Sequence, residues 1–126
     1  MSLDLGIAVA SEDLEAAESL LRAHFSVARF PHSLNVSAPG SELRVQLQTD
    51  PRYAPFVLRA SVRDVLGLSL PVAALEDVLQ GKVWAASDPE RRASKRQKDL
   101  ADIARVLEAR PQLRARVPPE ILARLV

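Results

Sequence analysis

The chain has 126 residues, of which 48% are apolar and 26% are charged, and its formal net charge is +1. This size and balance predict a single globular domain, residues 1–126, with one modest core. No stretch approaches the roughly 18 apolar residues of a membrane span, so we expect no membrane partner. The absence of cysteine excludes disulfides and thiolate metal sites and fits a cytoplasmic location.

The small net charge hides an uneven distribution along the chain. Residues 1–80 carry six basic and ten acidic side chains, a balance of −4, whereas residues 81–126 carry eleven and six, a balance of +5. Such asymmetry is typical of a protein whose basic half binds an anion, or of two halves that attract each other. Both interpretations stay open at this point.

The first part of the sequence reads as one helix among several strands. Leu3–Ala10 is apolar with β character at its end, which predicts a strand buried on both faces. Ser11 is expected to cap a helix that runs to about His24. Alternation with period two predicts further strands at residues 26–30, 33–38 and 42–48 and on both sides of Gly67.

The last part of the sequence reads as helical. One helix is expected from residue 73 or 74 to about Ala86, a second over roughly Pro89–Ala109, and a last one in "PPEILARLV". The apolar stripes of the first two are Leu75, Val78, Leu79, Val83 and Ala86, then Leu100, Ile103, Val106 and Leu107. This order predicts an α+β fold, a small mixed β-sheet flanked by helices, with C-terminal helices.

Lys82 lies three residues after Leu79, so it points into or along the apolar stripe of its helix. A lysine in that position needs an anion, or it extends along its own methylenes into water. On the next helix Asp99 and Asp102 flank the stripe, three residues apart. We therefore expect an ion pair from Lys82 to Asp102 or Asp99 that fixes the register of the two helices. A bound phosphate is the other anion that could pair with Lys82.

A basic run precedes these acids. Arg91, Arg92, Lys95 and Arg96 belong to the start of the second helix, away from its apolar stripe, so we expect them to be exposed. Together with Lys98 they could contact the phosphates of a nucleic acid, with strong salt dependence. No aromatic residue interleaves with the run, which argues against stacking on single strands.

Several segments of residues 70–108 recur together in one known family. They are Pro71-Val72, Leu75-Glu76-Asp77, Lys82, Arg91-Arg92 and Lys98-Asp99-Leu100-Ala101-Asp102-Ile103. This pattern resembles the C-terminal part of nucleotidyltransferase-fold proteins grouped with the AbiEii toxin and with minimal nucleotidyltransferase-like, uncharacterised relatives. The resemblance implies a nucleotidyltransferase-like domain in which Lys82 and Lys98 contact phosphate or nucleotide. Asp99 and Asp102 would be supporting acids.

The chemistry of that superfamily uses three acids on neighbouring strands to hold two magnesium ions, and a glycine-serine turn to hold the triphosphate. In this sequence Asp4 fits the first acidic position, Gly6 occupies the second, and Gln46 or Gln48 stands at the third. An amide cannot replace the charge of a carboxylate at a magnesium site. Asp4 is therefore expected to be a vestigial catalytic residue, with no metal bound. Native residues ahead of Met1 would restore the turn but not the acids.

The resemblance thus implies a fold with degenerate catalytic acids, inactive as a transferase, that acts as a binding module. Its partner would be a protein from a neighbouring gene, as in toxin–antitoxin pairs, with Trp84 and the segment "ILARLV" at the interface. One alternative is binding of nucleic acid or nucleotide through Arg91–Lys98. The other is an active transferase with a truncated or divergent site, supplied with acids such as Asp50 or Asp64. Only that case requires magnesium and a nucleoside triphosphate as cofactors.

Overall fold

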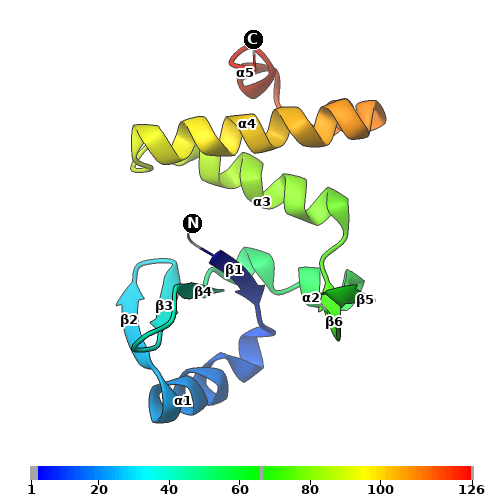
Figure 1. Cartoon of the computed structure of the whole chain (residues 1–126). Coiled ribbons are helices and arrows are strands. Elements are labelled where there is room, and N and C mark those ends of the chain that lie inside the picture. Colours follow the sequence, from blue (N-terminus) through cyan, green and yellow to red (C-terminus); the bar gives the residue numbers. More distant parts are fainter. Residues whose placement is uncertain (1–2, 66, 126) are drawn as a thin grey trace. The chain divides into compact units, whose positions relative to one another are not determined.

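The computed structural model describes residues 3–65 and 67–125 and divides into two compact units (Figure 1). Unit 1, residues 1–72, contains the strands, and unit 2, residues 73–126, is helical. The α+β class with C-terminal helices is confirmed, while the expectation of a single domain stays a prediction. The expectations for Met1, Ser2 and the side chain of Asp4 lie outside what the structure describes.

Unit 1 is built around a four-stranded sheet and a separate two-stranded hairpin. Its elements are β1 (Leu3–Ala8), η1 (Ser11–Asp13), α1 (Leu14–His24), β2 (Ser26–Phe30), β3 (Ser33–Ser37), β4 (Leu43–Gln48), η2 (Pro51–Tyr53), α2 (Phe56–Arg59), β5 (Ser61–Val65) and β6 (Leu68–Val72). The strand order is β1-β4-β3-β2, and β5 pairs with β6. Glycine allows the positive φ of 77° at Gly40 and 84° at Gly67, in the turns between paired strands.

The strands at residues 26–30, 33–37 and 43–48 confirm the alternation seen in the sequence. The β2–β3 and β3–β4 pairs are antiparallel, and β1 runs parallel to β4. Leu34 of β3 lies opposite Leu47 of β4 in the register, and both are buried, together with Val36. These side chains share one side of the sheet because successive residues of a strand point to opposite faces.

The expectation that the first strand is buried on both faces is wrong. Among the described strands β1 pairs only with β4, so it forms an edge of the sheet. Leu5 is 42% exposed and Ile7 is 37% exposed. A run of apolar residues does not by itself distinguish a central strand from an edge strand, because the number of neighbours depends on distant parts of the chain.

Helix α1 follows β1 through a short 3₁₀ turn rather than directly. Ser11 begins that turn, and the residue preceding α1 is Asp13, so the expected capping role of Ser11 is wrong. Glu18 of α1 forms ion pairs with Arg22 and with Arg29 of β2. Arg29 lies opposite Leu34 in the register, so α1 is tied to the apolar side of the sheet.

Unit 2 consists of helices that share one core. Its elements are α3 (Leu75–Ser87), α4 (Ala93–Ala109), η3 (Pro111–Arg116) and α5 (Pro119–Leu122). Figure 1 shows α3 and α4 side by side, and α5 contacts α3. The core consists of Leu79, Val83, Ala86, Leu100, Ile103, Leu107, Leu113, Val117 and Ile121. The two predicted stripes supply most of it, although Val78 is 39% exposed and lies at its edge.

Helix α4 begins four residues later than the sequence suggested. Residues 88–92 form a turn instead, in which the Asp88 carboxylate accepts a hydrogen bond from the backbone N–H of Glu90. The predicted final helix is a single turn of α-helix after a 3₁₀ segment. None of the helices within the described ranges combines the length and the apolar character needed to cross a bilayer.

Candidate functional site

Lys82 joins α3 to α4 through two carboxylates. Its Nζ lies 2.9 Å from Oδ2 of Asp102 and 3.8 Å from Oδ1 of Asp99. The expected ion pair between these helices is therefore confirmed. The Lys82 side chain is 32% exposed, whereas Asp99 is 2% exposed and Asp102 is 20% exposed. The site is thus a partly buried contact that holds the two helices in register.

Arg91 is the partner of Asp99 that the sequence did not reveal. Its Nε lies 2.8 Å from Oδ2 of Asp99, and its Nη2 lies 3.1 Å from Oδ1. This two-pronged geometry is the strongest arrangement between a guanidinium and a carboxylate. Lys82, Arg91, Asp99 and Asp102 together form the α3–α4 ion-pair network, in which two cations balance two carboxylates.

The expectation that Arg91, Arg92, Lys95 and Arg96 are all exposed is half wrong. Arg92 and Lys95 are exposed, but Arg91 and Arg96 are partly buried. The Nη2 atom of Arg96 donates to the backbone carbonyls of Asp88, at 2.7 Å, and of Arg91, at 3.2 Å. The reason is the turn at residues 88–92, which folds back beside α4 and draws these two arginines inward.

The Nε atom of Arg96 is buried, and the described residues provide no hydrogen-bond partner for it. The carbonyl contacts of Nη2 nevertheless hold the guanidinium in place. Arg96 thus stabilises the turn, because it donates hydrogen bonds to backbone carbonyl groups that lie before the start of α4.

Asp102 is the most shared group of the site. Besides Lys82 it contacts Arg105, whose Nη1 lies 3.0 Å from Oδ1, and Lys98, whose Nζ lies 4.0 Å from Oδ2. Partial burial acts to raise the pKa of Asp102, but the hydrogen bond from Lys82 and the charges of Lys82, Lys98 and Arg105 outweigh it. The pKa of Asp102 therefore lies below its ordinary value.

The degenerate acidic positions of the resemblance meet on two adjacent strands. In the parallel pairing of β1 with β4, Asp4 lies opposite Arg44, Gly6 opposite Gln46, and Ala8 opposite Gln48. Gly6 is thus a neighbour in the sheet of Gln46, one of the two residues expected at the third acidic position. They carry a hydrogen atom and a neutral amide instead of carboxylates.

Two other acids were candidates to complete such a site, and both have local roles. The Asp50 carboxylate accepts hydrogen bonds from the backbone N–H and the Nε of Arg52, and this side-chain contact lowers the pKa of Asp50 despite its partial burial. The Asp64 carboxylate accepts a hydrogen bond from the backbone N–H of Gly67 in the β5–β6 turn. Among the side chains described, no three acids or histidines lie close enough together to share a metal ion.

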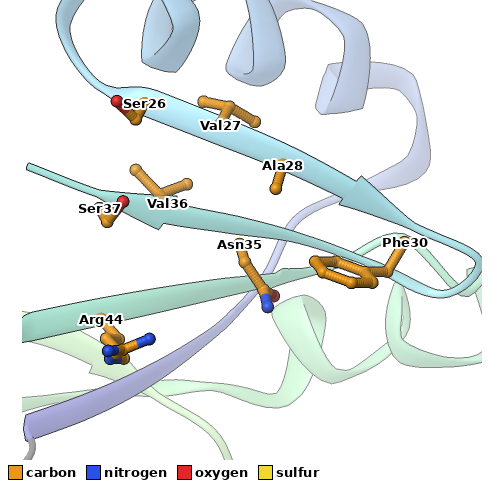
Figure 2. A pocket seen from close by; sticks show the side chains of 8 residues that line it. All are labelled: Ser26, Val27, Ala28, Phe30, Asn35, Val36, Ser37 and Arg44. Carbon is orange, nitrogen blue, oxygen red and sulfur yellow. The ribbon is translucent and has the colours of Figure 1, made fainter.

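A shallow hollow of about 330 Å³ lies over strands β2 and β3 of unit 1 (Figure 2). It is lined by Ser26, Val27, Ala28, Phe30, Asn35, Val36, Ser37 and Arg44. Asn35 pairs with Gln46 in the register, so the hollow lies on the same side of the sheet as the degenerate positions. Its polar groups are hydroxyls, an amide and one guanidinium, which suit a neutral or anionic ligand better than a metal ion.

Trp84 and the segment "ILARLV", the expected partner interface, both belong to unit 2. Trp84 is partly buried on α3. Of the segment "ILARLV", Ile121 is buried in the unit 2 core. No protein-family model matches the chain, and no curated protein sequence matches it.

The first prediction concerns the coupling between Lys82 and Asp102. Removing either charge by Lys82→Met or Asp102→Asn should lower the free energy of unfolding by about 1–3 kcal/mol, because the other charge is left partly desolvated. The double variant should lose less than the sum of the two, measured by urea unfolding. Arg105→Gln is the control, since an exposed contact to the same carboxylate is worth less than about 0.5 kcal/mol. Strictly additive losses would contradict the pairing.

A second prediction follows from the lowered pKa of Asp102. Its carboxylate stabilises the folded protein fully above the ordinary value of 3.8, and this contribution is lost as the pH falls through the lower folded value. The difference in melting temperature between the natural protein and Asp102→Asn, measured by thermal unfolding from pH 7 to pH 3, should therefore shrink below about pH 4. Glu108→Gln, on the exposed side of α4, serves as the control and should show no such convergence. A difference that persists unchanged at acid pH would mean that the carboxylate charge is not what stabilises the contact.

Proposed function

We propose that this chain is a nucleotidyltransferase-like protein without transferase activity that acts as a partner module for another protein, in the manner of a toxin–antitoxin pair. The observation that supports the loss of activity is the register of β1 and β4. Gly6, at the second acidic position, stands beside Gln46 on the neighbouring strand, one of the two glutamines at the third.

The loss of carboxylate charge at these positions removes the capacity to bind two magnesium ions. Two magnesium ions bring four positive charges, which the superfamily balances with three carboxylates and the phosphates of the nucleotide. Here one carboxylate, Asp4, remains, and its register partner is the cationic Arg44. Glutamine can offer a carbonyl oxygen but no charge, and glycine offers no side chain. The remaining groups are therefore too few and too weakly charged to hold a metal pair.

The contacts of Lys82 favour a structural role over a role in holding phosphate. Its ammonium group lies against Asp102 and near Asp99, so a phosphate would have to displace a carboxylate that is already paired. Asp99 is buried and also bound by Arg91, which leaves it little freedom to rearrange. The lysines implied as nucleotide contacts and the acids implied as supporting residues thus form ion pairs with one another.

The exposed apolar residues of β1 and β4 favour a protein partner. Leu5 and Ile7 lie opposite Val45 and Leu47 in the register, so with Leu43 they share one side of the sheet. Leu43 is 42% exposed, as is Leu5. Adjacent exposed apolar side chains on an edge strand are typical of a surface that another protein covers. Glu12 and Asp13 are exposed just beyond the end of β1, so the fitting partner carries apolar side chains beside basic ones.

The catalytic half of the proposal is tested by a transfer assay. With magnesium and labelled nucleoside triphosphates, the protein should release no more pyrophosphate than a blank, and calorimetry should detect no tight magnesium binding. Asp4→Asn should behave identically, because one isolated carboxylate cannot assemble the metal pair. Pyrophosphate release that disappears in Asp4→Asn would establish an active transferase with a divergent site and overturn this half of the proposal.

The partner half is tested by co-expression with the product of the neighbouring gene. We expect a stable complex, and Leu5→Asp combined with Ile7→Asp should weaken its affinity at least about tenfold, since burying a new charge costs more than 1.4 kcal/mol. Leu20→Asp is the matched control, because Leu20 is 64% exposed on α1 of the same unit and should leave affinity unchanged. No complex, or equal loss in the control, would contradict the proposed surface.

A further inference from the structure

Three cations of α4 and one residue just before it have exposed side chains that no buried contact holds. The side chains of Arg92 and Lys95 are exposed and form no hydrogen bond or ion pair with any described residue. The side chains of Lys98 and Arg105 are 73% and 75% exposed, and their contacts are limited to Asp102. We call Arg92, Lys95, Lys98 and Arg105 the α4 basic face.

The helical repeat aligns these residues. Lys95, Lys98 and Arg105 are separated by three and seven residues, so they lie on one side of α4, away from Leu100, Ile103 and Leu107. Arg92 stands immediately before the helix. From Lys95 to Arg105 the helix extends about 15 Å, at 1.5 Å per residue. Within this range Asp102 is the acid in contact with the face, and Lys82 already balances its charge.

Fold stability does not explain Arg92 and Lys95. A helix dipole disfavours positive charge in the first turn, yet α4 has no acidic residue there and has Lys95 within that turn. Arg91 and Arg96 have structural contacts that compensate for this cost, whereas Arg92 and Lys95 have none among the described residues. Arg92 and Lys95 therefore place positive charge where the described fold gains nothing from it, whereas Lys98 and Arg105 also pair with Asp102.

We infer that the α4 basic face binds the phosphate backbone of a double-stranded nucleic acid. About 15 Å of duplex axis carries roughly nine phosphates, enough to meet all four cations. A duplex fits better than a single strand because α4 contains no aromatic residue on which unpaired bases could stack. All four side chains would contact phosphates, and phosphate contacts carry no base-sequence information, so binding is independent of base sequence.

This surface belongs to unit 2 and does not depend on the proposed protein partner. The surface that supports that partner consists of Leu5, Ile7 and Leu43 in unit 1. Variants of the α4 basic face should therefore leave a complex with a protein partner intact, and Leu5→Asp with Ile7→Asp should leave nucleic-acid binding intact. Failure of one proposal can thus be told from failure of the other.

The test is a salt titration of binding to a fluorescein-labelled duplex of about 16 base pairs, followed by fluorescence anisotropy. Four phosphate contacts predict a slope of log affinity against log salt near −3.6, so affinity should fall about 150-fold between 50 and 200 mM salt. Changing Arg92, Lys95, Lys98 and Arg105 to glutamine should reduce the slope by about one for each residue replaced. The affinity for a single strand of the same length should be weaker than for the duplex.

The matched control removes the same charge elsewhere in unit 2, by changing Arg110, Arg114, Arg116 and Arg124 to glutamine, all of which are exposed. It should keep the slope of the natural protein within about one. Equal loss in the control would show attraction by net charge alone and overturn the inference, as would tighter binding of the single strand. If the fourfold variant does not fold, the double variant Arg92→Gln with Lys95→Gln serves as the test. Neither side chain forms a hydrogen bond or ion pair with a described residue. A slope unchanged in that pair would also overturn the inference.

Discussion

The buried carboxylate of Asp99 is the constraint on which the helical unit depends. With 2% of its side chain exposed, it must be compensated by cations, because an isolated charge in that position would be strongly destabilising. Arg91 supplies one cation through two hydrogen bonds, and Lys82 supplies another at 3.8 Å. These contacts connect α3, the turn at residues 88–92 and α4. Asp99 thereby fixes the path of the chain between the two long helices and, together with Asp102, their register.

That constraint divides the basic run into two groups. Arg91 turns inward to reach Asp99, and Arg96 turns inward to reach the carbonyls of Asp88 and Arg91, so both belong to the fold. Arg92 and Lys95 stay in solvent. Neighbouring basic residues therefore differ in role: some stabilise the fold and others are exposed to solvent. The composition of the run does not distinguish the two groups.

The parts of the structure that the sequence predicts are those governed by a repeat. Apolar spacing predicts α3 and α4 and places Leu79, Ile103 and Leu107 in the core, and the position of Lys82 beside that stripe predicts its pairing with Asp102. The pairing of Arg91 with Asp99 has no such signal. Arg91 lies in the non-helical turn before α4, eight residues before Asp99. The geometry of the pair therefore depends on where α4 begins.

The sheet shows the same limit. Alternation predicts β2, β3 and β4, because hairpin neighbours are close in sequence and their side chains alternate between core and solvent. The position of β1 at an edge is not encoded locally, since its partner β4 lies some 40 residues away in the chain. For the same reason the sequence shows that Gly6 and Gln46 lack carboxylates, but only the strand register makes them neighbours.

Asp102 links the stability of unit 2 to the charge of its surface. It accepts a hydrogen bond from Arg105 on the exposed side of α4 and pairs with Lys82 on the side that faces α3. Asp102 thus lies at the boundary between the helix contact and solvent, unlike the buried Asp99. At the boundary, it reduces the positive charge that Lys98 and Arg105 present to solvent and keeps Lys82 in place. A change at Asp102 would therefore alter both the contact between the helices and the positive charge that Lys98 and Arg105 present to solvent.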